Sequence, residues 1–154
     1  MKRIIFLDVD GVLNSINKLI EVYKLTGKSH SCYDYPFDDN CLEYLKYIVE
    51  ETDAYLVITS TWRKDEEGIE ILLNKLREFD LDKRVIGYTP ILGTKRFYEI
   101  KEYLDTLNEE VNFIILDDDS DMLEFSKNLI KTTTQVGLTK EQSEQAILKL
   151  KRVE

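Results

Sequence analysis

Short apolar runs alternate with amphipathic segments along the chain, and this alternation predicts strands separated by helices. Residues 3–8 (RIIFLD), 54–59 (AYLVIT) and 111–116 (VNFIIL) are apolar runs that are too short for helices, so we interpret them as buried strands. Residues 84–87 (RVIG) predict a short third strand in chain order, and residues 129–133 (LIKTT) predict a weaker fifth. Uninterrupted apolar strands are typical of parallel sheets that are covered on both faces.

Between these runs, apolar side chains recur at helical spacing and predict amphipathic helices. Asp39 is expected to cap the second helix, and residues 27–39 read as a loop. Thr139 is expected to begin the last helix, with Gln142 completing a capping box. The apolar stripes are Ile16, Leu19, Ile20 and Tyr23; Leu42, Leu45, Ile48 and Val49; Ile69, Leu72, Leu73, Leu76 and Phe79; and Phe97, Ile100, Leu104 and Leu107.

Strands that alternate with helices predict a three-layer α/β sandwich of the Rossmann-like class, with a mostly parallel five-stranded sheet. A chain of 154 residues is expected to form one domain. In such sheets ligands bind beyond the carboxyl ends of the strands. The residues that follow each predicted strand are therefore the first candidates for a functional site.

Acidic and hydroxyl side chains come directly after three of the strands. Asp8 and Asp10 follow the first, Thr59 and Ser60 follow the second, and the acidic run 117–121 follows the fourth. In a parallel sheet Asp8, Asp10, Asp117 and Asp118 would converge at one edge, and four carboxylates there cannot all stay ionised without a cation. Oxygen ligands without histidine or thiolate suit Mg²⁺, which binds through few carboxylates together with water and substrate phosphate. The sequence therefore predicts a magnesium site.

The same edge suits phosphoryl transfer. One carboxylate of the first pair can attack phosphorus, while the other protonates the leaving oxygen and then deprotonates the attacking water. A hydroxyl from Thr59 or Ser60, and a cation from Lys95 or Arg96 at the start of the following helix, would bind phosphate oxygens. Arg63 has two open interpretations, a bidentate grip on a substrate phosphate and a purely structural role.

Composition narrows the function further. The net charge of −9, from 21 basic and 30 acidic residues, argues against broad nucleic-acid binding, which depends on basic side chains. The single histidine, His30, excludes a histidine-rich metal site. No export signal or membrane-spanning run is apparent, so we expect a cytoplasmic protein in which Cys32 and Cys41 are reduced thiols.

Four motifs occur in a fixed order and resemble those of the haloacid dehalogenase (HAD) superfamily of phosphohydrolases. They are DVDGV at 8–12, VITS at 57–60, a basic residue at 95 or 96, and IILDDD at 114–119. The segments DVDGVLN, TSTWR, RxxEI, ILDDDSDM and GLT also resemble the small HAD domains associated with RNA repair proteins.

The resemblance implies a role for each matching residue. Asp8 would be the nucleophile and Asp10 the general acid/base, a second aspartate that phosphatases of the superfamily have and dehalogenases lack. Thr59 would bind the transferring phosphoryl group, with Ser60 as the alternative. Lys95 would neutralise the phosphate and Asp8, with Arg96 as the alternative.

The implied magnesium ligands are Asp8, the backbone carbonyl of Asp10, and Asp117 or Asp118, with Asp118 favoured as the direct ligand. Residues 14–40 occupy the position of the family's cap domain and have room for only one helix and a loop. An open site of this kind would favour larger substrates such as nucleic-acid ends, proteins or extended phosphoesters, while a short cap that selects a small metabolite stays an alternative.

Two further functional classes remain open at this stage. A receiver-like phospho-acceptor domain also places acids, a hydroxyl and a lysine at one sheet edge, but its acids and lysine come in a different order along the chain. A non-catalytic binding module with the same fold is the other alternative, and the intact motifs argue against it.

Overall fold

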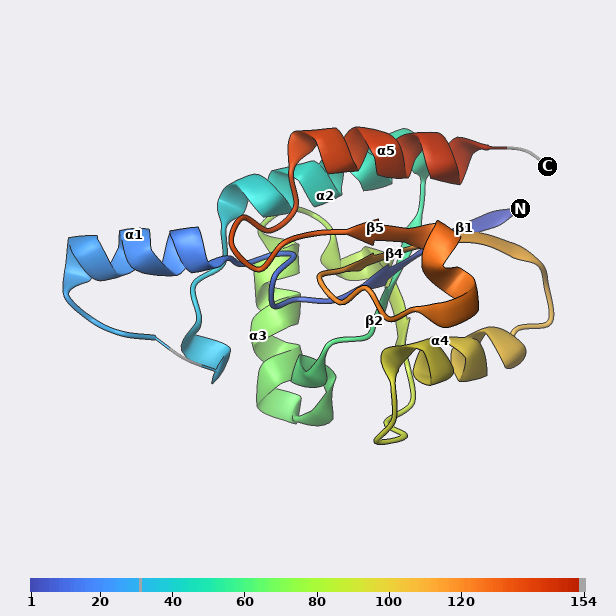
Figure 1. Ribbon diagram of the computed structural model, residues 1–154, viewed down its shortest axis with the longest axis horizontal. Helices are drawn as coiled ribbons and strands as arrows, with labels where there is room; N and C mark the ends of the chain where they lie inside the picture. Colours follow the sequence, from blue (N-terminus) through green and yellow to red (C-terminus); the bar gives the residue numbers. More distant parts are fainter. Residues whose placement is uncertain (31, 153–154) are drawn as a thin grey trace.

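Five strands form a single parallel sheet in the order β3-β2-β1-β4-β5, as seen in the computed structural model (Figure 1). The structure describes residues 1–30 and 32–152, with Cys32 described by its backbone alone. All four strand pairs are parallel, which confirms the predicted Rossmann-like α/β class. The strands are β1 (Lys2–Leu7), β2 (Tyr55–Ile58), β3 (Val85–Tyr88), β4 (Val111–Asp117) and β5 (Leu129–Lys131).

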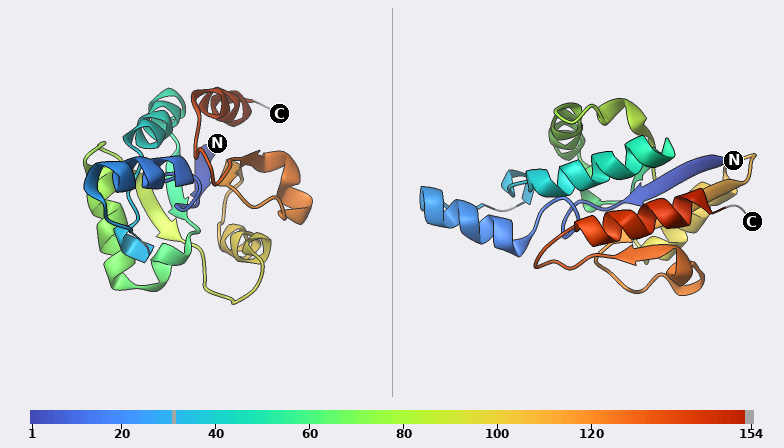
Figure 2. Two further views of the ribbon diagram at one scale, coloured as in Figure 1. Left: turned by 60° about the vertical axis from the view of Figure 1, so that its left-hand side comes forward. Right: turned by 90° about the horizontal axis from the view of Figure 1, so that it is seen from above.

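Helices cover both faces of the sheet, as Figure 2 shows from two further directions. On one face, Ile5 and Leu7 of β1 contribute to the larger apolar core together with residues of α2, α3 and α5. On the other face, Ile4 and Phe6 contribute to a smaller core with Ile100 of α4. The α-helices are α1 (Ile16–Thr26), α2 (Asp39–Thr52), α3 (Glu66–Arg77), α4 (Arg96–Asp105) and α5 (Lys140–Lys151); the 3₁₀ helices are η1 (Cys32–Asp34), η2 (Thr61–Lys64), η3 (Asp82–Arg84) and η4 (Leu123–Asn128).

Capping side chains explain where two of these helices begin. The predicted capping box at Thr139 is confirmed, because Thr139 and Gln142 exchange hydrogen bonds with each other's backbone. The predicted cap at Asp39 is wrong by one residue. Asp38 has the extended backbone that a cap requires, and its carboxylate accepts from the backbone N–H of Asn40 at 3.0 Å.

The segment 14–40 contains α1 and a loop with one short 3₁₀ helix. Helix α1 forms as predicted, but none of its residues is buried, and its stripe leaves Ile20 44% and Tyr23 52% exposed. The helix projects away from the sheet in Figure 1 and in the right-hand view of Figure 2.

Cys41 is a free, buried cysteine, as expected of a reduced thiol. Burial, with a further contribution from the charge of Asp38, raises the pKa of its thiol to about 12. The side chain of Cys32 lies outside the described residues.

Among the described residues, no helix is both long and apolar enough to cross a bilayer.

Strand register brings the ends of three strands to the same level. Leu7, the last residue of β1, is level with Ile58 of β2 and Leu116 of β4. The pairing continues one residue further, since the backbone N–H of Asp8 donates to the carbonyl of Leu116 at 3.1 Å, and that of Thr59 donates to the carbonyl of Leu7 at 2.9 Å. Asp8, Thr59 and Asp117 are therefore neighbours at the carboxyl edge.

Candidate active site

A cavity of about 550 Å³ opens at this carboxyl edge of the sheet. It brings together residues from the ends of β1, β2 and β4 and from the loop that leads into α4. Its lining residues are Asp8, Asp10, Thr61, Arg63, Lys64, Gly93, Thr94, Lys95, Arg96, Glu99, Asp118 and Asp119. The cavity is thus lined by both carboxylates and cations, which suits a metal ion together with an anionic substrate.

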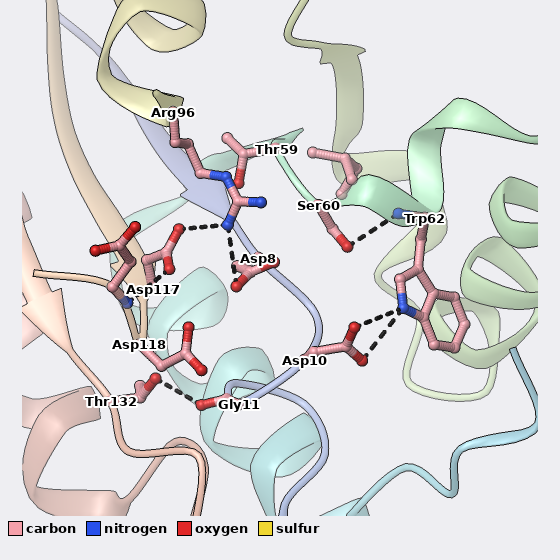
Figure 3. A network of polar contacts seen from close by, with 12 residues as sticks. Asp8, Asp10, Gly11, Thr59, Ser60, Trp62, Arg96, Asp117, Asp118 and Thr132 are labelled. Atoms are coloured by element: carbon pink, nitrogen blue, oxygen red, sulfur yellow. Dashed lines mark hydrogen bonds and ion pairs between the residues drawn. The ribbon is translucent and has the colours of Figure 1, made fainter. Parts of the chain in front are cut away.

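Three carboxylates form a tight cluster at the inner end of the cavity. Asp8, Asp117 and Asp118 each place one oxygen within 4.8 Å of the others (Figure 3). Burial, followed by the negative charge of Asp117, raises the pKa of Asp8 to about 8. Burial also raises the pKa of Asp117, whose side chain is fully buried. A buried acidic cluster of this kind favours binding of a cation, which would lower the cost of ionising all three groups.

Arg96 balances part of this negative charge. Its Nη1 donates to Oδ2 of Asp117 at 2.7 Å and lies 3.1 Å from Oδ2 of Asp8. Burial lowers the pKa of Arg96, but the two carboxylates outweigh this effect and raise it. Lys95, which the resemblance favoured for the contact with Asp8, is the N-cap of α4 and pairs instead with Asp121 at 2.8 Å. The structure therefore brings Arg96, and not Lys95, against Asp8.

The two candidate hydroxyls after β2 have different environments. Thr59 is fully buried, and its Oγ1 has no hydrogen-bond partner. The hydroxyl of Ser60 accepts from the backbone N–H of Trp62 at 3.1 Å and so caps η2. A buried polar atom without a partner is uncommon in native proteins. Thr59 is the hydroxyl with unused bonding capacity beside Asp8.

The expected convergence of Asp10 with the other three carboxylates is wrong, because its side chain lies apart from the cluster and points toward η2 (Figure 3). Its Oδ1 accepts from Nδ2 of Asn14 at 2.8 Å and from Nε1 of Trp62 at 3.2 Å. The same indole nitrogen lies 3.3 Å from Oδ2 of Asp10. Asn14 is itself fixed, because its Oδ1 accepts from the backbone N–H of Gly11 at 3.0 Å. The carboxylate of Asp10 is thus oriented by two side-chain donors.

The turn after β1 is held close to β4 and β5. Gly11 has a φ of +80°, and its carbonyl accepts from the hydroxyl of Thr132 at 2.6 Å. A Cβ at position 11 would lie 2.3 Å from Oδ2 of Asp118. Asp118 also accepts from the hydroxyl of Thr134 at 2.9 Å. Glycine is needed at position 11 both for its backbone conformation and for the approach of Asp118.

The guanidinium of Arg63 is buried and bonded within the protein. It donates to the carbonyls of Thr59, Ser60, Thr89 and Pro90 at 2.6 to 3.0 Å. Its Nη2 also pairs with Glu99 at 3.0 Å. These contacts join the end of β2, the loop before α4 and α4 itself. Although Arg63 lines the cavity, the geometry favours its structural interpretation.

Sequence reasoning missed several residues that complete the site. The contacts of Asp10 with Asn14 and Trp62, the bond from Thr132 to Gly11, and the pairing of Glu99 with Arg63 were not anticipated. Glu99 and Trp62 do fall within the RxxEI and TSTWR segments that carried the resemblance. Their positions in these motifs were a signal that could have singled out Glu99 and Trp62, but only the folded structure shows which residues they contact.

Comparison with known proteins agrees with this geometry. The model of a family described as the HAD domain in Swiss Army Knife RNA repair proteins matches residues 4–143, which include the whole carboxylate cluster, Arg96 and Thr59. No curated protein and no solved structure matches the chain. The family match covers most of the chain and confirms the resemblance drawn from the motifs. The chain therefore belongs to this HAD family, a family of the phosphohydrolase type.

Proposed function

We propose that the protein is a Mg²⁺-dependent phosphomonoesterase that acts through an aspartyl-phosphate on Asp8. The observation that carries the proposal is the placement of Asp8, which is 5% exposed and lies between two acidic partners and the guanidinium of Arg96. A nucleophilic carboxylate of this kind needs cations on either side to accept an anionic substrate.

The residues present fit a magnesium ion. Asp8, Asp117 and Asp118 offer three oxygens from two neighbouring strand ends, and no described residue of this cluster is a histidine or cysteine that would favour a softer metal. Mg²⁺ characteristically uses few carboxylates and keeps water and phosphate oxygens as its other ligands. When bound, the ion would supply positive charge that offsets the repulsion between Asp8 and the substrate phosphate.

The side chains then divide the reaction between them. The carboxylate of Asp8 attacks phosphorus while the bond from phosphorus to the leaving oxygen breaks, and Asp10 gives its proton to that oxygen. In the second half, water attacks the phosphoryl group, Asp10 takes the proton of that water, and Asp8 is released with free phosphate. Arg96 and the hydroxyl of Thr59 bind the phosphoryl oxygens throughout.

The end of a phosphorylated nucleic acid is the substrate class that we propose. The matching family occurs in RNA repair proteins. The cavity is open at the carboxyl edge, and Lys64 and Lys95 lie in its lining beyond the carboxylate cluster. Lysines there can contact phosphates adjacent to a terminal one. The net charge of −9 agrees with recognition of an end rather than of a long duplex.

The proposal is tested by a phosphatase screen with and without Mg²⁺. The panel compares an aryl phosphate, nucleotides, sugar phosphates, phosphopeptides, and RNA and DNA with 3′- or 5′-phosphates. We expect Mg²⁺-dependent phosphate release, with the highest kcat/KM on a nucleic-acid end. No release from any member of the panel at saturating Mg²⁺ would reject the enzymatic proposal, and a preference for sugar phosphates would reject the substrate class.

Replacing Thr59 by valine should lower activity without lowering stability. The valine keeps the shape of the side chain but removes the hydroxyl that has no partner in the protein. We expect kcat/KM to fall by roughly tenfold, the worth of one hydrogen bond to a charged group. The melting temperature should be unchanged or higher. Ser60→Ala serves as the comparison, because it removes the cap of η2 and should lower the melting temperature. Lower stability with full activity in Thr59→Val would contradict the role of Thr59.

Replacing Gly11 by alanine should weaken magnesium binding. The added Cβ would meet Oδ2 of Asp118 at 2.3 Å, so the carboxylate must move. We expect the Mg²⁺ concentration for half-maximal activity to rise by roughly 10- to 100-fold. Gly27→Ala is a matched control, because Gly27 has a similar φ of +69° but nothing within 4 Å of the added Cβ. Both variants should lose some stability through backbone strain, whereas only Gly11→Ala should need more Mg²⁺ for half-maximal activity.

A further inference from the structure

We infer that Trp62 is a positioning residue for Asp10, held in place by the insertion between β1 and α2. The inference rests on the proposed role of Asp10 as general acid/base. Trp62 is the only tryptophan in the chain and is 2% exposed. Its indole Nε1 faces the carboxylate of Asp10 across 52 positions of sequence, at 3.2 and 3.3 Å from the two oxygens.

The two donors leave Asp10 with one oxygen suited to proton transfer. Oδ1 accepts from both Asn14 and Trp62, whereas Oδ2 has only the longer contact to the indole. Among the described residues, no other hydrogen bond reaches Oδ2, so it is the oxygen able to carry the proton. An indole N–H can only donate, and therefore it fixes the orientation of the carboxylate without competing for that proton.

The indole is fixed by residues of the insertion. The ring of Tyr33 packs edge-on against Trp62 at a centroid distance of 5.2 Å, and the ring of Phe37 packs against it at 5.4 Å. The hydroxyl of Tyr33 donates to Asp65, the N-cap of α3. Gly68 of α3 completes the enclosure, because a Cβ there would lie 2.3 Å from the carbonyl of Trp62 and 2.8 Å from the ring of Tyr33.

This packing gives the insertion a role in the chemistry. The charge of Asp10 also acts on a second tyrosine of the insertion, because burial and then this charge raise the pKa of Tyr35. Tyr33 and Phe37 of the insertion therefore pack against the indole that orients Asp10. Correct placement of the insertion, and not only coverage of the substrate, sets the direction in which Asp10 offers its proton.

The first test is a double-mutant cycle between Trp62→Phe and Asp10→Asn. Phenylalanine keeps a ring against Tyr33 and Phe37 but removes the N–H. The readout is kcat/KM on an alkyl phosphate, whose leaving group needs a proton, relative to an activated aryl phosphate, whose leaving group needs it far less. We expect this ratio to fall about tenfold in Trp62→Phe, which matches the loss of one hydrogen bond to a charged group. In the Asp10→Asn background, Trp62→Phe should change the alkyl-to-aryl ratio little.

The outcomes separate this inference from the proposed function. If Asp10→Asn leaves the alkyl-to-aryl ratio unchanged, the acid/base role of Asp10 is wrong and the inference fails with it. If Asp10→Asn lowers the ratio but Trp62→Phe does not, or if the two effects simply add, only the positioning role of Trp62 is overturned.

A second measurement does not depend on activity or on the folding of Trp62→Phe. Because Trp62 is the only tryptophan, a ¹H–¹⁵N spectrum contains a single indole N–H resonance. Asp10→Asn should move this resonance upfield and speed its exchange with solvent, since a neutral amide is a weaker acceptor than a carboxylate. Asp121→Asn, which removes a carboxylate that pairs with Lys95, should leave it in place. If the chemical shift and exchange rate of the indole N–H stay unchanged in Asp10→Asn, the inference is wrong.

Discussion

Asp8→Asn should abolish phosphate release while the protein remains folded. We expect kcat to fall by roughly four orders of magnitude or more, because loss of a nucleophile removes the covalent route entirely. The melting temperature in metal-free buffer should equal or exceed that of the wild type. Burial raises the pKa of Asp8 to about 8, so at neutral pH the folded protein must either keep a proton on Asp8 or bury its charge. The neutral amide of asparagine at position 8 avoids both of these free-energy costs.

Two controls make the result for Asp8 specific. Wild-type protein that is quenched in acid during turnover should carry one phosphoryl group, and peptide mapping should locate it to Asp8 and find none in Asp8→Asn. Asp119→Asn removes another carboxylate of the cavity lining and should retain most of the activity. If Asp8→Asn keeps more than about one hundredth of wild-type kcat, far more than loss of a nucleophile allows, the covalent mechanism is wrong.

Arg96→Gln should lower both activity and stability, and Mg²⁺ should restore part of the stability. Arg96 contacts two buried carboxylates and is the cation that the structure places between them. Removing one partner of a buried charge pair costs roughly 3 kcal/mol, which for a chain of this size corresponds to a fall of about 6–12 °C in melting temperature. A divalent cation at the carboxylates would offset part of this loss. We expect kcat/KM to fall by about 100- to 1,000-fold, as for loss of a charged donor to the transition state.

The neighbouring lysine provides the matched control for Arg96. Lys95→Gln removes a cation one position away that is 57% exposed and paired with Asp121. It should leave the melting temperature and its Mg²⁺ response close to those of the wild type. It should weaken binding of a nucleic-acid end more than binding of an aryl phosphate, because Lys95 lies in the outer part of the cavity. Equal losses in the two variants would contradict the assignment of the inner cation to Arg96.

The fold was largely accessible from the sequence, because strand burial and helix capping are local signals. The apolar run of β1 and the capping box at Thr139 each depend on residues a few positions apart. The cap at Asp38 was missed because adjacent aspartates carry equal capping propensity, and only the extended backbone of Asp38 distinguishes them. The exposure of α1 was not accessible either, since an amphipathic pattern predicts a helix but not what covers its apolar side.

The sequence was sufficient to predict which residues form the candidate site, but it predicted few of the contacts that they make. The ends of parallel strands brought Asp8, Thr59 and Asp117 together as expected. The choice between Lys95 and Arg96 depended on the direction of each side chain at the first turn of α4. The buried position of Arg63 among carbonyls depended on loops that are distant in sequence. Such contacts are set by tertiary packing, which no local spacing encodes.

The central position of β1 also has a consequence for how the chain folds during synthesis. Residues 4–7 pair on one side with 55–58, but on the other side residues 2–7 pair with 111–116. Strand β1, which leaves the ribosome before the other strands of this sheet, therefore keeps one open edge until more than a hundred further residues have emerged, and non-local parallel pairing of this kind is slow. Docking of β4 closes that edge and brings Asp117 beside Asp8 in the same event. A nascent chain thus completes its sheet and assembles its acidic cluster together, so a cation available at that moment would favour both.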